Sequence, residues 1–200
     1  MDLRERIIKE TGELCFKYGI KRITMDDIAR QLGISKKTIY QHFRDKNEIV
    51  ELLIANLVGF QSEVMDKNAA LSENSVKEVF MLVTHLKEML SKINPMLFYD
   101  LQKYHPVAWE AFSAFRDRYF KNNLIKNLNR GISEGLFREE LNLEIMSILR
   151  IEELNMIFNQ QAFHAGRFNL ADVMNEVSEH YLYGICTLKG HTLIDKYKQQ

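Results

Sequence analysis

A run of hydrogen-bond donors lies between residues 35 and 42. Its sequence is Ser-Lys-Lys-Thr-Ile-Tyr-Gln-His, which contains no carboxylate. Lysine, tyrosine and glutamine side chains donate hydrogen bonds to phosphate oxygens and to the acceptor groups on base edges. A helix that exposes these residues on one face suits a polyanionic partner, and the residues expected on that face are Lys36, Lys37, Tyr40 and Gln41.

Residue types that perform catalysis are present but scattered. The six histidines form no His-x-x-x-His or Glu-x-x-His pair, and the chain has no Gly-rich phosphate loop and no nucleophile in a recognisable elbow. Cys15 and Cys186 lack the spacing of metal ligands, so we expect buried thiols in a reducing compartment. The sequence argues against an enzyme, and we expect no catalytic residue, no metal and no cofactor.

Charge is distributed unevenly along the chain. The formal net charge is zero, with 27 basic and 27 acidic residues, which alone would argue against a nucleic-acid partner. Residues 1–48, however, carry 11 Lys or Arg and 8 Asp or Glu, whereas the remaining 152 residues carry 16 and 19. The basic excess is confined to the N-terminal end, where it would attract phosphates.

The composition predicts an all-α protein of about nine helices. Only two prolines and nine glycines interrupt the 200 residues, 46% of which are hydrophobic, and no sustained strand-like alternation is present. Polar caps and apolar spacing predict four N-terminal helices, at about residues 2–18, 25–32, 36–42 and 46–60. Their expected N-caps include Thr24, Ser35 and Asp45.

Longer helices are expected after residue 66. The first covers about residues 76–93 and is ended by Asn94-Pro95, and a short segment at 96–104 precedes a helix that continues to about residue 133. The last two helices are expected at about residues 143–164 and 170–188. Gly190 is expected to close the final helix as the residue after its C-cap.

Residues 24–43 have the pattern of two helices that meet at a steep angle. Ala29 supplies a small residue at the contact, and Gly33 supplies a turn residue that can take a positive φ. The corner would be buried by Ile28, Leu32, Ile34 and Ile39. The alternative is a simple packing corner with solvated lysines, but such a corner has no need to collect donors on its exposed face.

The chain resembles the TetR family of regulators over residues 3–60. The resemblance is carried by Thr24 together with Asp27-Ile28-Ala29, Gly33-Ile34-Ser35, Thr38-Ile39-Tyr40, His42-Phe43 and Asp45-Lys46. It implies a helix-turn-helix at residues 24–43 that reads double-stranded DNA. This motif would lie in a DNA-binding domain of residues 1–47, or to about 61 with the start of the fourth helix, followed by a helical ligand-binding and dimerisation domain at 48–200.

The resemblance also implies roles for individual residues. The side chains expected on backbone phosphates are Thr24, Ser35, Thr38, Tyr40, His42 and Lys46. Those expected nearest the base edges are Lys36, Lys37 and Gln41. Many relatives have a small residue, often glycine, at the position of Lys37, and whether this extra cation reads a guanine edge or a phosphate stays open.

Helices that follow the DNA-binding unit in this family enclose a small-molecule pocket. Residues 96–120 contain eight aromatics, a density that could line a pocket for an apolar or aromatic effector of unknown identity. The candidate pocket residues are Met81, His85, Met89, Phe98, Tyr99, Trp109, Phe112, Phe115, Tyr119 and Phe158. Core packing is the alternative use of each.

The last two helices of the family pair with a second copy. Here the first of them has more apolar residues than one core face requires, and the second has apolar residues at spacings of three and four, with Gly184 permitting close approach. We therefore expect a homodimer on a palindromic operator. The expected interface residues are Leu154, Ile157, Phe158, Val173, Val177, Tyr181, Gly184 and Ile185.

The residues together predict a cytoplasmic, sequence-specific DNA-binding transcriptional regulator without a membrane span. Repression is favoured over activation, because a dimer that occupies a promoter blocks polymerase. A helical interaction or ligand-binding protein that does not bind DNA is the alternative, and a gel shift would separate the two.

Overall fold

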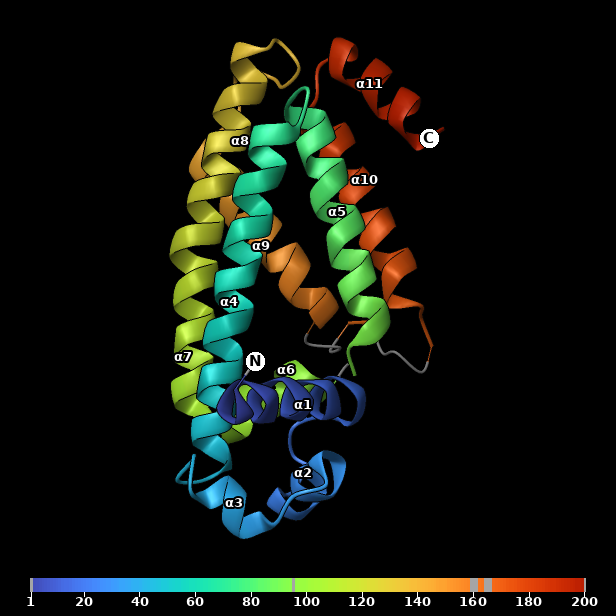
Figure 1. Ribbon diagram of the computed structural model, residues 1–200. Coiled ribbons are helices and arrows are strands. Elements are labelled where there is room, and N and C mark those ends of the chain that lie inside the picture. The colour runs from blue at the N-terminus through green and yellow to red at the C-terminus, as the bar shows by residue number, and fades with distance from the viewer. Residues whose placement is uncertain (1, 95, 159–161, 164–166, 200) are drawn as a thin grey trace. The chain divides into compact units, whose positions relative to one another are not determined.

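The computed structural model describes residues 2–94, 96–158, 162–163 and 167–199 (Figure 1). Within these residues it contains eleven α-helices and one π-helical segment, and its strand-like pairing is an isolated bridge between Phe137 and Cys186. The all-α prediction is confirmed. No helix in the described part of the chain is long and apolar enough to cross a membrane.

The chain divides into two compact units. The first comprises residues 1–60 and 92–115, and the second comprises residues 61–91 and 116–200. The expected division placed everything after about residue 61 in one domain, whereas residues 92–115 cluster with the N-terminal residues. The helix α4 (Lys46–Leu71) begins in the first unit and ends in the second.

The first unit contains α1 (Leu3–Tyr18), α2 (Met25–Leu32), α3 (Lys36–Tyr40), the start of α4, α6 (Met96–Tyr104) and α7 (Pro106–Ala114). The bounds of its first three helices agree with prediction to within two residues. The helix α1 begins at a capping box of Asp2 and Glu5 that the sequence analysis did not anticipate. Cys15 is fully buried on α1, and burial raises the pKa of its thiol to about 12.

Polar contacts join α6 to the end of α1 within this unit. The Lys21 N–H donates to the Asp100 carboxylate at 2.9 Å, and the Asn94 side-chain amide donates to the Lys17 carbonyl at 3.4 Å. Asp100 is only 4% exposed, so a partner for its charge is required. The turn after α1 is therefore bonded directly to α6, which explains why residues 92–115 belong to this unit.

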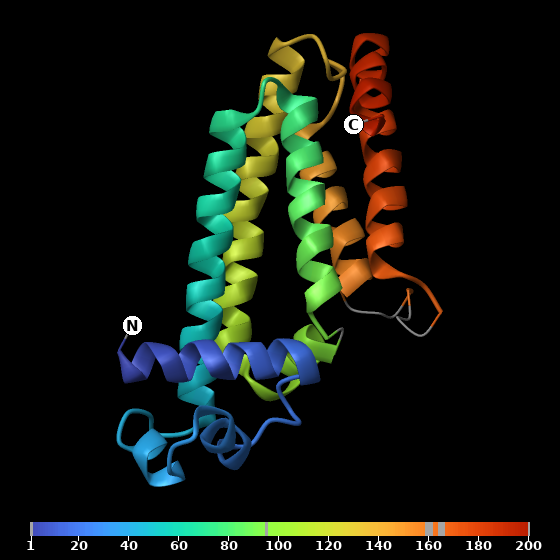
Figure 2. The same cartoon turned by 45° about the vertical axis from the view of Figure 1, so that its right-hand side comes forward.

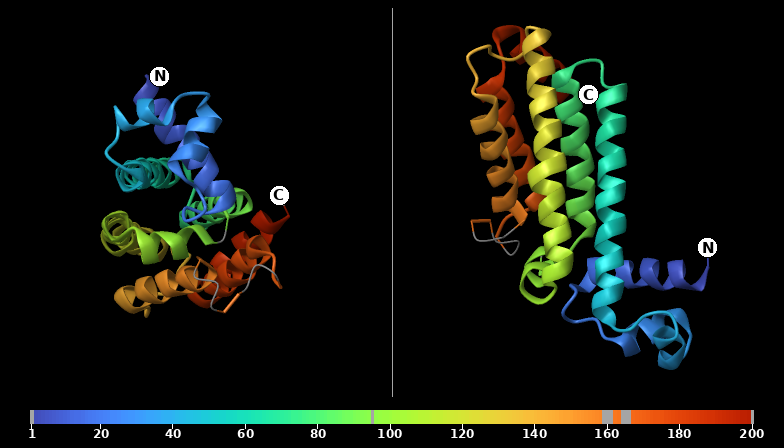
Figure 3. Two further views of the ribbon diagram at one scale, coloured as in Figure 1. Left: turned by 90° about the horizontal axis from the view of Figure 1, so that it is seen from below. Right: turned by 90° about the vertical axis from the view of Figure 1, so that its left-hand side faces the viewer.

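The second unit contains α8 (Lys121–Ser133), α9 (Leu143–Phe158), α10 (Leu170–Ile185) and α11 (Leu188–Lys198). It also contains α5 (Ser75–Lys92) except for its last residue, and a π-helical segment (Phe115–Phe120) except for its first. The C-terminal part of α4 runs alongside α5 and α8 (Figures 2 and 3). Arg130 of α8 links these helices, because its guanidinium donates to the Ala69 carbonyl of α4 at 3.2 Å and to the Glu78 carboxylate of α5 at 3.3 Å.

Two predicted helices are interrupted in the structure. The helix expected to reach about residue 133 is α7, the π-helical segment and α8 in succession. The final predicted helix stops at Ile185, because Cys186 takes an extended conformation and Thr187 caps a new helix, α11. Gly190 was wrongly expected to close a helix and instead lies inside α11. The predicted end of the preceding helix, at His164, lies outside the described residues.

The close approach of α8 to the following turn requires a glycine. A Cβ atom on Gly131 would lie 2.0 Å from the ring of Phe137, which is fully buried and cannot move aside. A Cβ atom on Gly59 of α4 would meet no atom within 4 Å.

These two glycines provide a matched test of the fold. Gly131→Ala is expected to lower the free energy of unfolding by about 2 kcal/mol, because overpacking against Phe137 outweighs the gain in helix propensity. Gly59→Ala is expected to raise it by about 0.5–1 kcal/mol. Chemical denaturation of both variants measures the difference, and equal effects of the two substitutions would contradict the packing seen at Gly131.

Candidate nucleic-acid interface

The second helix begins at a capping box that fixes its direction. The Asp27 N–H donates to the Thr24 hydroxyl at 3.2 Å, and the Thr24 N–H donates to the Asp27 carboxylate at 3.0 Å. The hydrogen bonds from Thr24 lower the pKa of Asp27. Gly33 ends the helix with φ of 67°, the left-handed conformation expected of it, and Ser35 caps α3 by accepting from the Thr38 N–H at 3.0 Å.

Apolar side chains hold α3 against α2 from behind. Ile28 and Ile39 are fully buried, and Ala29 and Leu32 are buried beside them. Ile34, expected in the same group, is only half-buried. Burial of these residues determines which face of the five-residue α3 points outward.

The outward face of α3 carries the predicted donors. Lys36, Lys37 and Gln41 are exposed, and Tyr40 is 49% exposed. Further along, His42 is also exposed, whereas the Thr38 hydroxyl lies 2.8 Å from the Ser35 hydroxyl in a half-buried position. We call the surface of Ser35, Lys36, Lys37, Tyr40, Gln41 and His42 the α3 face.

One carboxylate competes for the cations of the α3 face. The Lys36 ammonium donates to Asp26 of α2 at 2.8 Å, and this hydrogen bond raises the pKa of Lys36. Residues 35–42 contain no carboxylate, so this competitor comes from the preceding helix. Among the described residues Lys37 forms no ion pair, so the two lysines differ in availability.

Lys46 has a different environment from the other predicted phosphate contacts. Its ammonium donates to the carbonyls of Ile20 at 3.0 Å and Ile23 at 2.8 Å, and burial lowers the pKa of the side chain. The loop between α1 and α2 is thereby held to the first turn of α4. Lys46 positions the corner through these bonds, and its role at a phosphate stays a prediction.

The ten predicted pocket residues divide between the two units. In the first unit, Phe112 packs against Phe98 and Trp109 with ring centroids 5.4 and 5.7 Å apart. Exposed Tyr99 of α6 accepts a hydrogen bond from Lys103 at 2.8 Å, and Phe115 is the last residue of this unit.

In the second unit, Gln61 links two of the predicted residues. The Nε2 atom of His85 lies 2.8 Å from Gln61 Oε1, and the Gln61 amide lies 3.6 Å from the Met89 sulfur. The Tyr119 hydroxyl donates to the Ser62 carbonyl at 3.2 Å. Met81 and Phe158 are half-buried in the same unit.

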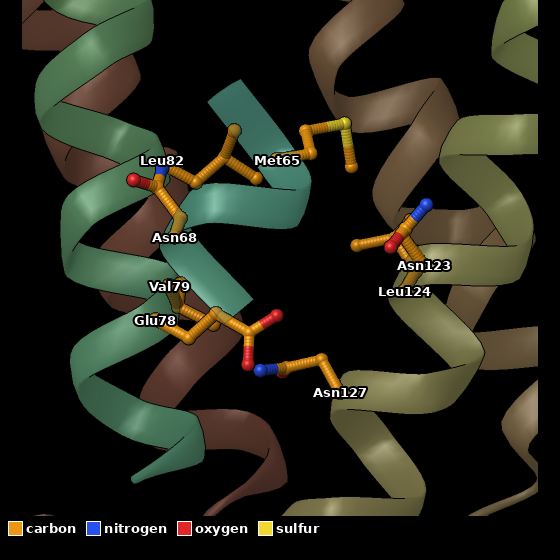
Figure 4. Close-up of a pocket in the computed structure, with 8 residues that line it drawn as sticks. All are labelled: Met65, Asn68, Glu78, Val79, Leu82, Asn123, Leu124 and Asn127. Atoms are coloured by element: carbon orange, nitrogen blue, oxygen red, sulfur yellow. The ribbon is translucent and has the colours of Figure 1, made fainter. Parts of the chain in front are cut away.

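The second unit also contains a cavity that the sequence did not predict. It measures about 30 Å³ and lies among α4, α5 and α8 (Figure 4). None of its lining residues belongs to the predicted pocket set, because asparagine and glutamate at these positions have the sequence pattern of an ordinary helix surface. Its polar lining residues are Asn68, Glu78, Asn123 and Asn127.

Most of the predicted dimer-interface residues are buried inside the protomer. Leu154, Ile157, Val173, Tyr181 and Ile185 are between 0 and 8% exposed, because α9 and α10 pack against each other (Figures 1 and 2). These five therefore contribute to the core of the protomer, and their place at a dimer interface stays a prediction. Val177 and Phe158 are half-buried, and Gly184 is exposed.

A different set of apolar side chains faces outward on α9. The spacing of three, four and seven residues places them on one side of the helix. They are Ile145, Ile148, Leu149 and Met156, which are 60, 45, 47 and 44% exposed. We call this set the α9 stripe.

Comparison with known proteins gives a consistent result for the N-terminal part. Residues 7–53 match the family described as bacterial regulatory proteins, tetR family. The HTH-type transcriptional regulator YvaF of Bacillus subtilis is 24% identical over 182 residues, which cover 90% of this chain and 94% of that protein.

Solved structures share the fold over nearly the whole chain. A protein from Saccharomonospora viridis, solved in complex with choline, matches with a TM-score of 0.74 at 15% identity and covers 92% of this chain and 97% of its own. The transcriptional regulator FadR from Bacillus subtilis, solved in complex with stearoyl-CoA, matches with a TM-score of 0.71 at 19% identity, covering 90% and 98%.

Removal of the competing carboxylate tests the electrostatics of the α3 face. Asp26→Asn is expected to tighten binding to a short DNA duplex of arbitrary sequence severalfold and to steepen its salt dependence by about one unit of slope, because Lys36 is released to a phosphate. Fluorescence anisotropy across a salt series measures both. The control is Glu139→Gln, an exposed acid outside the first unit, and identical behaviour of the two variants would contradict the assignment.

Proposed function

The chain belongs to the TetR family of helix-turn-helix transcriptional regulators, and we propose that it is a repressor that binds a palindromic operator as a homodimer and leaves it when a small molecule binds. Membership of this family confirms DNA binding and the expectation that the chain is not an enzyme. Repression, dimerisation and ligand release are the proposed parts.

The α3 face is the observation that carries the proposal. A short helix with exposed lysine, tyrosine and glutamine side chains has the size and chemistry to enter a major groove. In the proposed complex Lys36, Lys37 and Gln41 lie nearest the bases. Backbone phosphates are bound by Thr24, Ser35, Thr38, Tyr40, His42 and, through its remaining N–H, Lys46.

The α9 stripe supports the homodimer. Four large apolar side chains on one helix face are costly to expose, and a second copy would bury them. Gly184 on α10 is exposed, and a Cβ atom there would meet nothing within 4 Å, so the glycine leaves room for the close approach of a second copy. A twofold axis at this face would relate the α3 helices of the two copies. The operator would then consist of two inverted half-sites, one for each copy.

Ligand release follows from a population shift. A small molecule that binds better to the form in which the two recognition helices are wrongly spaced would lower the fraction of DNA-competent dimer. Two structural relatives were solved with small ligands, choline in one and stearoyl-CoA in the other. Occupation of the promoter by the free dimer would block polymerase, which favours repression over activation.

Selection of DNA from a random duplex library tests the function directly. The selected sites are expected to share an inverted repeat with half-sites about 34–36 Å apart, or a multiple of that distance. Lys37→Ala is expected to weaken binding to the selected operator and to reduce the salt slope by about one, because no carboxylate in the described part of the chain pairs with Lys37, which would contact a phosphate. The matched control is Lys126→Ala, an exposed lysine of α8.

Two results would count against these assignments. An unchanged salt slope with relaxed preference at one base pair would move Lys37 from a phosphate to a base edge. Failure of the chain to enrich any sequence above nonspecific affinity would contradict the operator itself.

A charge placed in the α9 stripe tests the dimer. Leu149→Arg is expected to convert the dimer to a monomer and to reduce operator affinity at least about tenfold, because each half-site would bind alone. Leu71→Arg, which changes a leucine that is 63% exposed on α4, is expected to leave both unchanged. Sedimentation at micromolar concentration measures the mass, and a monomeric wild-type chain would refute the proposed assembly.

A further inference from the structure

An ion pair joins the start of α2 to the start of α3. Asp26 lies in the first turn of α2, and Lys36 is the first residue of α3. Their side-chain atoms Oδ2 and Nζ are 2.8 Å apart, although the two residues are ten positions apart in the sequence. Because α2 and α3 lie side by side (Figures 1 and 2), this pair extends the α3 face onto α2. We call it the Asp26–Lys36 pair.

Both side chains of the pair are accessible to a partner. The side chain of Asp26 is 61% exposed and that of Lys36 is 44% exposed. The second carboxylate oxygen, Asp26 Oδ1, accepts no hydrogen bond from any residue that the structure describes. An ammonium has three N–H groups, and Lys36 uses one of them on Oδ2. The pair can therefore accept a hydrogen bond and donate one without separating.

The neighbouring carboxylate of Asp27 is not available in the same way. Its Oδ2 atom accepts from the N–H and the hydroxyl of Thr24 at 3.0 and 2.6 Å, and its Oδ1 atom accepts from Arg30 at 3.4 Å. Asp27 thus belongs to the capping box of α2. Among the described residues, Asp26 is the acidic residue that bonds to the α3 face.

A base pair presents a donor beside an acceptor in the major groove. In a G·C pair these are cytosine N4 and guanine O6, and in a T·A pair they are adenine N6 and thymine O4. The two atoms share a Watson–Crick hydrogen bond, so they lie about 2.9 Å apart. This distance matches the 2.8 Å between Nζ and Oδ2 of the Asp26–Lys36 pair. The ammonium can therefore meet the acceptor while the carboxylate meets the donor of the same base pair.

The order of donor and acceptor across the groove distinguishes the two strands. G·C and T·A place the keto oxygen on the first strand and the amino group on the second, whereas C·G and A·T place them in reverse. In a reversed base pair the carboxylate would face a keto oxygen and the ammonium would face an amino group, and both contacts are unfavourable. Guanine N7 offers the ammonium a second acceptor, whereas a methyl group lies beside thymine O4. G·C is therefore favoured over T·A.

We propose that Asp26 is a specificity-determining residue, and that the Asp26–Lys36 pair reads one G·C base pair in each half-site of the operator. Lys36 donates to guanine O6 and N7, and Asp26 accepts from cytosine N4. At sequences that offer no amino group in this place the carboxylate is repelled, so the same residue weakens binding to the wrong DNA. This inference rests on the proposed function, because it requires an operator.

Affinities for a set of operator variants test the assignment. The wild-type chain first selects its operator from the random duplex library, and each base pair of the half-sites is then replaced by the other three. Fluorescence anisotropy at fixed salt is expected to reveal one position at which G·C binds at least about tenfold more tightly than C·G. Asp26→Asn is expected to reduce this ratio severalfold, because an amide both donates and accepts, and to leave the ratios at other positions unchanged. Lys36→Met is expected to reduce the ratio at the same position.

Removal of the complementary atom from the DNA gives an independent measurement. Replacement of the cytosine at that position by 2-pyrimidinone, which lacks the N4 amino group, is expected to weaken wild-type binding about fivefold or more and to affect Asp26→Asn less. The matched control is Glu179→Gln, which removes the carboxylate of a partly exposed 2.6 Å ion pair with Lys198 in the second unit. This control is expected to behave as the wild type on every duplex.

The possible outcomes separate this inference from the proposed function. An operator at which Asp26→Asn keeps every base preference of the wild type would overturn the inference and leave the proposed function standing. Equal affinity of the wild type for cytosine and 2-pyrimidinone would do the same, as would an equal loss of preference in Glu179→Gln. Failure of the wild type to enrich any sequence would overturn both.

Discussion

Burial of Ile28, Leu32 and Ile39 is the constraint on which the orientation of the α3 face depends. The helix α3 has five residues, far below the length at which an isolated helix is stable in water. Its conformation is therefore maintained by the apolar contact with α2 and by the Ser35 cap. Loss of this contact would remove the outward orientation of Lys36, Lys37 and Gln41 together, since all three lie on or directly after this short helix.

Polar contacts also hold the loop between α1 and α2, which leads into the helix pair of α2 and α3. Lys46 bonds the carbonyls of Ile20 and Ile23, and Asp100 of α6 accepts from the Lys21 N–H. The loop that enters α2 is thus bonded to residues up to 79 positions later in the chain. The N-terminal unit is therefore larger than the 47 residues that match the family, and α6 connects it to later parts of the chain.

Local signals in the sequence predicted the helices well, because caps and glycines act within a few residues. Thr24, Gly33 and Ser35 illustrate this in the corner. The errors concern long-range contacts. Nothing in the spacing of Asp26 reveals its bond to Lys36, and a helix such as α9, which is apolar on more than one face, does not show which side faces inward. The cavity was missed because asparagines at ordinary surface spacing carry no signal until α4, α5 and α8 are packed together.

The two cysteines lie in different units, Cys15 on α1 and Cys186 after α10, and both are buried with thiol pKa values raised to about 12. At neutral pH almost none of either thiol is ionised, and the ionised form is the one that reacts with alkylating reagents. Modification must therefore wait until the surrounding helices open. Each of the two units therefore contains one cysteine whose alkylation reports local opening of that unit. The rates of alkylation at Cys15 and Cys186 show whether the two units open together or separately.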